Sequence, residues 1–487
     1  MYKKTKRFRC LTGTLAAAAL LLLFLPVCAL AAVNGIPGPT FTLTAKTDHI
    51  NTADGSNMLL WGYADGISRA QYPGPTLIVT QGQTVIVTLK NQLNVPVSIV
   101  FAGQKVTALG GIPGLLAREA LKNDDPATPA VDESTVMYSF TPDQPGTYLY
   151  SSGTDPHLQV QMGLFGALIV RPATNATMAG CDPTDPTRVM ATAYGDCRSA
   201  YDHETLFILS ETDPALHSLV EVGRIEEVKT TEFFPVSWFI NGRGGPDTLA
   251  PYKASWLPTQ PYDCFTRTTP GDRVLLRLVG AGRDSHPFHT HGNNMDVIAR
   301  DGRLLSTDPA NPLATRPAEV GVVPDLAVSN FTNNTLPGAT YDAIYAWTGR
   351  NLGWDVFGPI NTTCIDAAPL DGFDDADPTR LCHDAICNDL DLDDFDDFTK
   401  EWCPDHGNSF PVARTDIKDL TFGQFYSGSP FLGSAGALPP GEGGFNPNAG
   451  FFFMWHSHNE KELTNNDIFP GGMLTMLVVE PPGTPIE

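Results

Sequence analysis

Basic residues are scarce in this chain: its 487 residues include 31 Lys and Arg against 54 Asp and Glu, a formal net charge of −23. This deficit argues against nucleic acid and anionic membrane surfaces as partners. The sequence also lacks a Cys-X-X-Cys-His motif, which excludes covalent attachment of a c-type haem. Helical repeats and heptads are absent as well, while a hydrophobic fraction of 42% allows a sizeable core.

A hydrophobic run long enough to span a membrane is also lacking. Residues 15–25 are apolar, but this run is shorter than the roughly 18 residues that indicate a spanning helix. It follows a basic start at residues 3–9 and precedes Ala-Leu-Ala at 29–31, so residues 1–31 are predicted to be a secretory signal peptide. We therefore expect export to the periplasm, the cell surface or the exterior, without a membrane span.

Two of the nine cysteines lie in this leader, which leaves seven. Outside the cytoplasm such cysteines usually form disulfides, and an odd number leaves one unpaired. Cys181 and Cys197 are predicted to close a loop, and four others lie in or beside residues 364–405, which we interpret as a Cys- and Asp-rich insertion. Its acidic run at 389–397 is either a calcium site or a solvated acidic loop, since carboxylate oxygen suits hard cations.

Short β-branched runs predict an all-β protein. Residues 76–80 and 84–89 flank a Gln-Gly-Gln turn, and comparable runs follow at 135–140, 146–151, 164–170, 205–210, 236–240 and 273–279. Strands at this spacing are typical of a β-sandwich or a Greek-key barrel. We predict a first domain at residues 34–172, a linker at 173–200, and a second domain at 201–487 that contains the insertion.

Two His-X-His sequences point to metal chemistry. His289 and His291 lie in SHPFHTHGNN, and His456 and His458 lie in FFFMWHSHNE. Residues at i and i+2 of a β-strand share a face, so both rings of a pair reach one centre. Imidazole suits copper, zinc, iron and nickel. The alternative is an empty site in which the four rings bond to each other and to water.

Several segments resemble the multicopper oxidases. They are YPGPTLIVTQGQTVIVTLKNQLNVPVSI at 72–99, PGTYLY at 145–150, QVQMGLFGALIVRP at 159–172 and WFINGRGGPDTL at 238–249, together with the two His-rich segments. The resemblance covers most of residues 73–481 apart from the insertion. It implies tandem cupredoxin-like Greek-key β-sandwich domains, copper as the cofactor, and dioxygen reduction coupled to the oxidation of phenols, metal ions or similar substrates.

The resemblance also implies roles for individual residues. The family's three-copper cluster takes its ligands from four His-X-His pairs, of which this chain keeps the two made by His289, His291, His456 and His458. These four imidazoles would hold one copper ion, or two with added water or carboxylate, because the complete cluster cannot assemble in the usual way. A separate blue-copper site would include His286, and Met473 would be its axial ligand. Further candidate ligands beside these are Asp296, Glu460, Glu462 and Asp467.

The chain departs from the family pattern at both copper sites. The family's two first-domain His pairs are replaced by VFAG at 100–103 and SSG at 151–153, near which His157 is the one imidazole. Ser457 stands where the blue-copper Cys belongs, and Glu462 falls at the next blue-copper His. A Ser hydroxyl is not ionised at neutral pH and is a poor soft-metal ligand, so the thiolate electron conduit is absent.

These observations lead to a main hypothesis and an alternative. The main hypothesis is a secreted multicopper-oxidase-like protein that binds copper through the two C-terminal His-X-His pairs, with catalysis of a non-standard kind left open. Its partners would be copper ion, an unknown small-molecule or protein redox partner, and further copies of the chain in a homo-oligomer. The alternative is a metal-free cupredoxin scaffold that acts as a structural or interaction protein at the cell surface. A weaker third hypothesis supplies electrons from a haem protein.

Overall fold

The computed structural model describes residues 33–122, 133–182, 187–307, 323–349, 373–374, 377–381, 396, 402–405, 451–480 and 485–486. The predicted signal peptide lies outside these residues, and so does most of the predicted insertion at 364–405, including its acidic run at 389–397 apart from Asp396. Within the described part, no helix has the length and apolar character needed to cross a bilayer.

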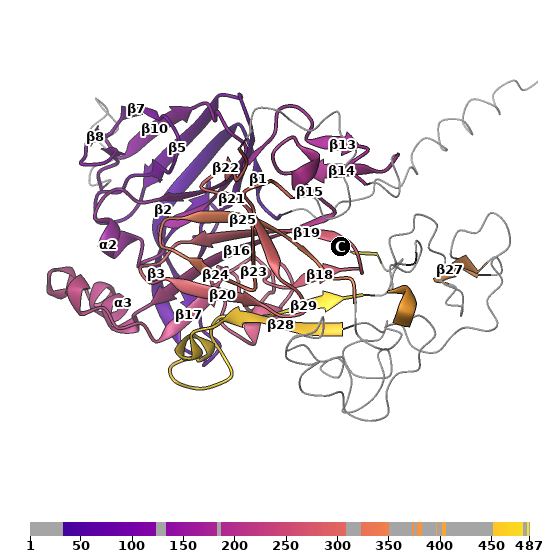
Figure 1. Ribbon diagram of the computed structural model, residues 1–487. Helices are drawn as coiled ribbons and strands as arrows, with labels where there is room; N and C mark the ends of the chain where they lie inside the picture. The colour runs from indigo at the N-terminus through magenta and orange to yellow at the C-terminus, as the bar shows by residue number, and fades with distance from the viewer. Residues whose placement is uncertain are drawn as a thin grey trace, which may run out of the picture.

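Two five-stranded sheets face each other in the N-terminal half of the described chain (Figure 1). One has the order β1 (Ile36–Pro37), β4 (Leu77–Thr80), β12 (Phe165–Arg171), β11 (Gly146–Ser151) and β6 (Val100–Phe101). The other has the order β3 (Asn57–Asp65), β2 (Thr40–Asn51), β5 (Val85–Asn91), β10 (Thr135–Phe140) and β7 (Thr107–Gly110). A small pair, β8 (Ile112–Pro113) and β9 (Arg118–Glu119), and the short helix α2 (Pro156–Gln159) complete this half.

The C-terminal half repeats this architecture. Its larger sheet has the order β17 (Ser237–Ile240), β16 (His203–Thr212), β19 (Arg273–Gly280), β25 (Thr340–Ala346), β21 (Met295–Arg300) and β22 (Arg303–Leu304), with β23 (Val328–Asn330) paired to β21. The facing sheet has the order β18 (Thr266–Thr268), β29 (Leu474–Val479), β28 (Phe451–Ser457), β20 (His286–Thr290) and β24 (Thr332–Thr335). The fold class predicted from the sequence, all-β with tandem β-sandwiches, is confirmed.

The remaining elements are short. Helix α3 (Pro214–Glu221) is capped at its N-terminus by Asp213, whose carboxylate accepts a hydrogen bond from the amide N–H of Ala215. The 3₁₀ turns are η1 (Cys197–Ser199), η2 (Ile225–Glu227), η3 (Thr230–Glu232), η4 (Asp247–Leu249), η5 (Cys403–Asp405) and η6 (Glu460–Leu463), and β26 (Phe373–Asp374) pairs with β27 (Asp377–Leu381).

Residues 173–200, predicted to be a linker, contain strands. β13 (Thr177–Ala179), β14 (Val189–Thr192) and β15 (Ala200–Tyr201) form a three-stranded sheet. The predicted disulfide between Cys181 and Cys197 is present beside it, and Cys264 is a free, buried thiol. The exact domain limits stay a prediction.

Alternation of side chains explains the strands and their burial. In β5 the inward residues Val85, Val87 and Leu89 are fully buried while the residues between them are half-buried or exposed. Six of the seven β12 residues are buried. Leu168 packs into the core of the first sandwich and Ile169 into a second cluster that it shares with the other sandwich, so both faces of this strand are covered.

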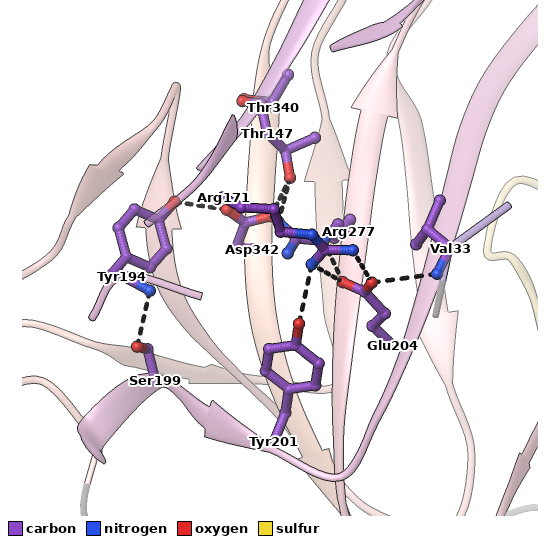
Figure 2. Close-up of polar contacts among 10 residues, drawn as sticks. All are labelled: Val33, Thr147, Arg171, Tyr194, Ser199, Tyr201, Glu204, Arg277, Thr340 and Asp342. Carbon is purple, nitrogen blue, oxygen red and sulfur yellow. Dashed lines mark hydrogen bonds and ion pairs between the residues drawn. The ribbon is translucent and has the colours of Figure 1, made fainter. Parts of the chain in front are cut away.

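A polar network joins the two halves at their buried boundary (Figure 2). Glu204 of β16 accepts hydrogen bonds from Arg171 of β12 and from Arg277 Nε of β19, the latter at 3.0 Å. Arg277 also donates to Thr147 Oγ1 at 2.8 Å, and Thr147 donates to Asp342 at 2.5 Å. Buried charges are tolerated when they are paired and hydrogen-bonded in this way.

Candidate metal centre

Strand pairing brings the two His-X-His sequences together. β20 and β28 are neighbours in one sheet (Figure 1). They pair in antiparallel fashion, with His289 directly opposite His456. Phe288 and Ser457, which are also opposite each other, are fully buried on the core side. Because side chains alternate along a strand, the imidazoles of both sequences lie on the other face of this sheet.

The imidazoles form a close group on that face. Nitrogen atoms of His289, His291 and His456 all lie within 4.8 Å of one another, and the Nε2 atoms of His291 and His456 are 3.0 Å apart. His458 is exposed at the rim, with its ring centroid 4.8 Å from that of His289. The structure thus gathers all four residues that the sequence singled out.

Neighbouring groups orient these rings. Nδ1 of His289 lies 2.8 Å from the hydroxyl of Thr332 on β24. Nδ1 of His456 lies 2.6 Å from the backbone carbonyl of Ser457, which can only accept, so this nitrogen donates. Fixing the proton on Nδ1 leaves the Nε2 lone pair of His456 directed toward His291. Sequence analysis missed Thr332, because its contact depends on the pairing of β24 with β20.

Burial keeps two of the rings neutral at neutral pH. Burial lowers the pKa of His289, and the adjacent rings of His291 and His456 lower it further, to about 3. Burial likewise lowers the pKa of His456, against the opposing effect of the Ser457 carbonyl. A neutral imidazole is the form that binds a metal ion.

The opposite face of the same strands holds a different set of groups. His286 is fully buried, with Nδ1 at 3.0 Å from Glu462 and Nε2 at 2.8 Å from Glu211. Burial alone would lower the pKa of His286, but hydrogen bonds to Glu211 and Glu462 outweigh it and raise the pKa to about 9. The ring is therefore an imidazolium held between two carboxylates.

Each carboxylate has further donors. Glu462 accepts from the Ser457 hydroxyl at 2.5 Å and from the Asn459 side-chain amide at 2.9 Å. Glu211 accepts from the backbone N–H groups of Arg283 and Asp284, at 2.5 and 3.1 Å. The region where the resemblance implies a blue-copper site is thus a closed hydrogen-bonded network. Sequence analysis missed Glu211, although an acidic residue directly after the apolar run 205–210 was a signal for it.

Met473 lies beside this network. It is fully buried in the core between the C-terminal sheets, and its backbone N–H donates to the carbonyl of Glu462 at 2.8 Å. Both ring nitrogens of His286 are occupied by carboxylates. The predicted roles of His286 and Met473 as metal ligands stay predictions, and the hydrogen bonds of His286 leave it no nitrogen lone pair in this protonation state.

The first sandwich contributes packing where the family has imidazoles. Phe101 of β6 is buried, and its ring lies 4.8 Å from Phe140 and 5.9 Å from Tyr150, centroid to centroid. Ser151 pairs with Val100 at the edge of the same sheet. The nearby His157 is exposed on α2, with Nδ1 at 2.9 Å from Asp155.

Comparison with known proteins gives one matching family and several similar proteins. Residues 44–175 match the family described as multicopper oxidase. Copper resistance protein A of Escherichia coli is 28% identical over 268 residues, which cover 48% of this chain and 38% of that protein. Laccase-1 of Thanatephorus cucumeris is 28% identical over 263 residues, covering 50% and 38%. The chain therefore spans less than half the length of these relatives.

A solved structure of similar extent is the blue copper oxidase from Nitrosomonas europaea, with a TM-score of 0.48, 16% identity, and coverage of 90% of this chain and 85% of that one. L-ascorbate oxidase of Cucurbita maxima is 25% identical over 309 residues, covering 55% of this chain and 47% of that protein. The resemblance inferred from the sequence motifs is confirmed by the family match and the curated relatives. The chain is a relative of the multicopper oxidases, with the family's domain recognised at residues 44–175.

Proposed function

We propose that this protein binds copper through His289, His291 and His456, with His458 at the rim of the site. The observation that carries the proposal is the approach of three imidazole nitrogens to within 4.8 Å of one another on one sheet face. Imidazole is a good ligand for copper, and the curated relatives include a protein named for copper resistance. The donor set therefore fits the ion.

Bound copper would supply one-electron redox chemistry at this face. The protein's own contribution is to hold the rings: Thr332 orients His289, and the Ser457 carbonyl sets the tautomer of His456. His458 is exposed and His456 only half-buried, so a small molecule or a protein redox partner can approach closely. Close approach matters because Ser457 stands where the family has the Cys that conducts electrons to its copper cluster.

On this basis we propose a copper-dependent oxidoreductase of a non-standard kind. Relatives named as laccases and an ascorbate oxidase favour oxidoreductase chemistry, and the grouped neutral imidazoles favour copper over the metal-free scaffold hypothesis. Export to an oxidising compartment is part of the proposal, and the disulfide between Cys181 and Cys197 supports it. A homo-oligomer also remains a proposal.

Copper loading of the purified full chain tests the proposal. The wild type should retain copper after removal of excess ion, and its electron paramagnetic resonance spectrum should show nitrogen hyperfine lines. His289→Ala and His456→Ala should each weaken binding by roughly tenfold or more, because each removes one nitrogen ligand. His157→Ala, which changes an exposed imidazole away from the site, is the matched control. Copper retention that is equal in all four proteins would disprove the assignment.

A further inference from the structure

Two methionines lie opposite each other on the sheet face that carries the imidazoles. Met454 of β28 is paired with Met476 of β29, and His456 is paired with Leu474 in the same antiparallel ladder. Residues directly opposite in such a ladder have Cβ atoms about 4.5–5.5 Å apart. The two thioether side chains therefore leave the backbone side by side and in the same direction.

Alternation places both methionines on the outer side of the sheet. Their strand neighbours Phe453, Trp455 and Leu477 are fully buried and belong to the core between the C-terminal sheets. Met454 and Met476 are only half-buried and do not belong to that core. Methionine often fills irregular gaps in a core, but the core side of these two strands is already filled by other residues.

The methionine pair adjoins the imidazole group. Met454 is two residues before His456 on the same strand, a spacing of about 7 Å along one face. On the neighbouring strand β20, His289 is opposite His456 and Thr290 is opposite Trp455. His291 follows Thr290 directly, just past the end of β20, and the Trp455 indole N–H donates to its carbonyl at 3.2 Å. The row of Met454 and Met476 thus runs across the sheet next to the row of His289 and His456.

We propose that Met454 and Met476 form a separate site for a soft monovalent cation, copper(I) being the ion it would take. Thioether sulfur selects copper(I) over harder ions. Methionine has three rotatable side-chain bonds, so the two sulfur atoms can adjust to opposite sides of one ion. The site goes beyond the nitrogen-ligated centre proposed above. It provides sulfur ligands about one strand repeat from His456.

Silver(I), a redox-inert analogue of copper(I), is the probe that tests this site. Binding to the full chain is measured by competition with a chromophoric chelator, after exposed thiols have been alkylated in every sample. Met454→Leu, Met476→Leu and the double variant are compared with wild type. Leu approximates the volume of Met. Met178→Leu changes a half-buried methionine on β13, outside the site, and is the matched control.

We expect the wild type and the Met178→Leu control to bind silver(I) equally. The double variant should bind it more weakly by roughly tenfold or more, and each single variant by less. X-ray absorption should show sulfur neighbours of silver in the wild type that are missing in the double variant. Equal silver(I) affinity in the wild type and the double variant, or no binding by the wild type, would overturn the proposal.

Two further measurements separate this site from the nitrogen-ligated one. The double variant should retain copper(II) with nitrogen hyperfine lines, which also shows that the fold is intact. His289→Ala should bind copper(II) more weakly by roughly tenfold or more but keep the methionine-dependent silver(I) binding. If no protein, the wild type included, binds copper(II) while silver(I) binding still depends on Met454 and Met476, the proposed function alone is disproved. If the wild type binds copper(II) but silver(I) binding does not depend on Met454 and Met476, the methionine site alone is disproved.

Discussion

The residue at position 457 decides whether the C-terminal sandwich can form a copper–thiolate bond. Ser457 points into the core, away from the imidazole group, and its hydroxyl donates to Glu462. Glu462 in turn holds one nitrogen of His286, and Glu211 holds the other. The two departures from the family pattern, Ser457 and Glu462, therefore support one another, and Glu211 completes the network because the imidazolium needs both carboxylates as counter-charges.

Restoring the thiol alone should not create a blue-copper site. In Ser457→Cys the sulfur would face Glu462 and a protonated His286, whose two nitrogens are both engaged. We therefore expect no intense copper–thiolate charge-transfer band in the visible spectrum after copper(II) is added. The wild type serves as the baseline, since the buried Cys264 is present in both proteins. A strong visible band in the single variant would show that the carboxylate–imidazolium network yields to copper.

Sequence analysis located most of this chemistry at the residue scale. Ser457 and Glu462 were identified from their positions in the final His-rich segment, and the four clustered imidazoles from their spacing. Glu211 was not, since it lies 75 residues before His286 and reaches it only after β16 and β20 pack face to face. A contact between two sheets depends on tertiary packing, which no local pattern records.

At the scale of elements, β-branched runs predicted several of the strands and missed others, among them the long β2 (Thr40–Asn51). Residues 84–89 became β5 (Val85–Asn91), and 205–210 lie inside β16 (His203–Thr212). The three-stranded sheet β13–β14–β15 was taken for a linker because its strands are only two to four residues long. Ala191 and Tyr201 from this sheet pack on Leu275, so tertiary contacts rather than local propensity hold it.

Glu204, on the central strand β16, should make the fold sensitive to acid. Burial by itself would raise the pKa of Glu204, but Arg277 and Arg171 outweigh it and lower the pKa to about 2. A depressed native pKa contributes stability that is present above the unfolded-state value near 4.5 and lost as pH falls through about 2. From the size of the shift, this contribution is roughly 3 kcal/mol.

Urea unfolding between pH 6 and 2, as a rough working range, measures this contribution. Glu204→Gln should be less stable than wild type near neutral pH, because Arg171 and Arg277 lose their counter-charge, and the difference should shrink as the pH falls. Glu221→Gln, at a half-exposed position, is the control and should follow the wild-type curve. A stability difference between Glu204→Gln and wild type that does not change with pH would contradict the charge assignment.

At the scale of the whole molecule, the two sandwiches share a hydrophobic cluster. Tyr72 from the first half packs edge-on against Phe165 of the first half at 5.2 Å and Phe239 of the second half at 5.7 Å, between ring centroids. Its hydroxyl donates to Ser210 Oγ of β16 at 3.1 Å. Together with the ion network around Glu204 (Figure 2), this cluster makes the boundary between the halves resemble a core.

A shared core predicts that the halves unfold together, and a pair of substitutions tests it. Phe140→Ala removes a side chain from the first sandwich's own core, at a cost of about 3–5 kcal/mol. Hydrogen exchange should then show lower protection in β21 of the second sandwich as well as in β5 of the first, because global unfolding exposes both.

Tyr72→Ala weakens the shared cluster, so in that background Phe140→Ala should lower protection in β5 while β21 changes little. The cycle of single and double variants isolates the coupling between the halves. If Phe140→Ala leaves the hydrogen-exchange protection of β21 unchanged when Tyr72 is present, each sandwich is stable by itself. The buried boundary would then position the two sandwiches rather than stabilise them.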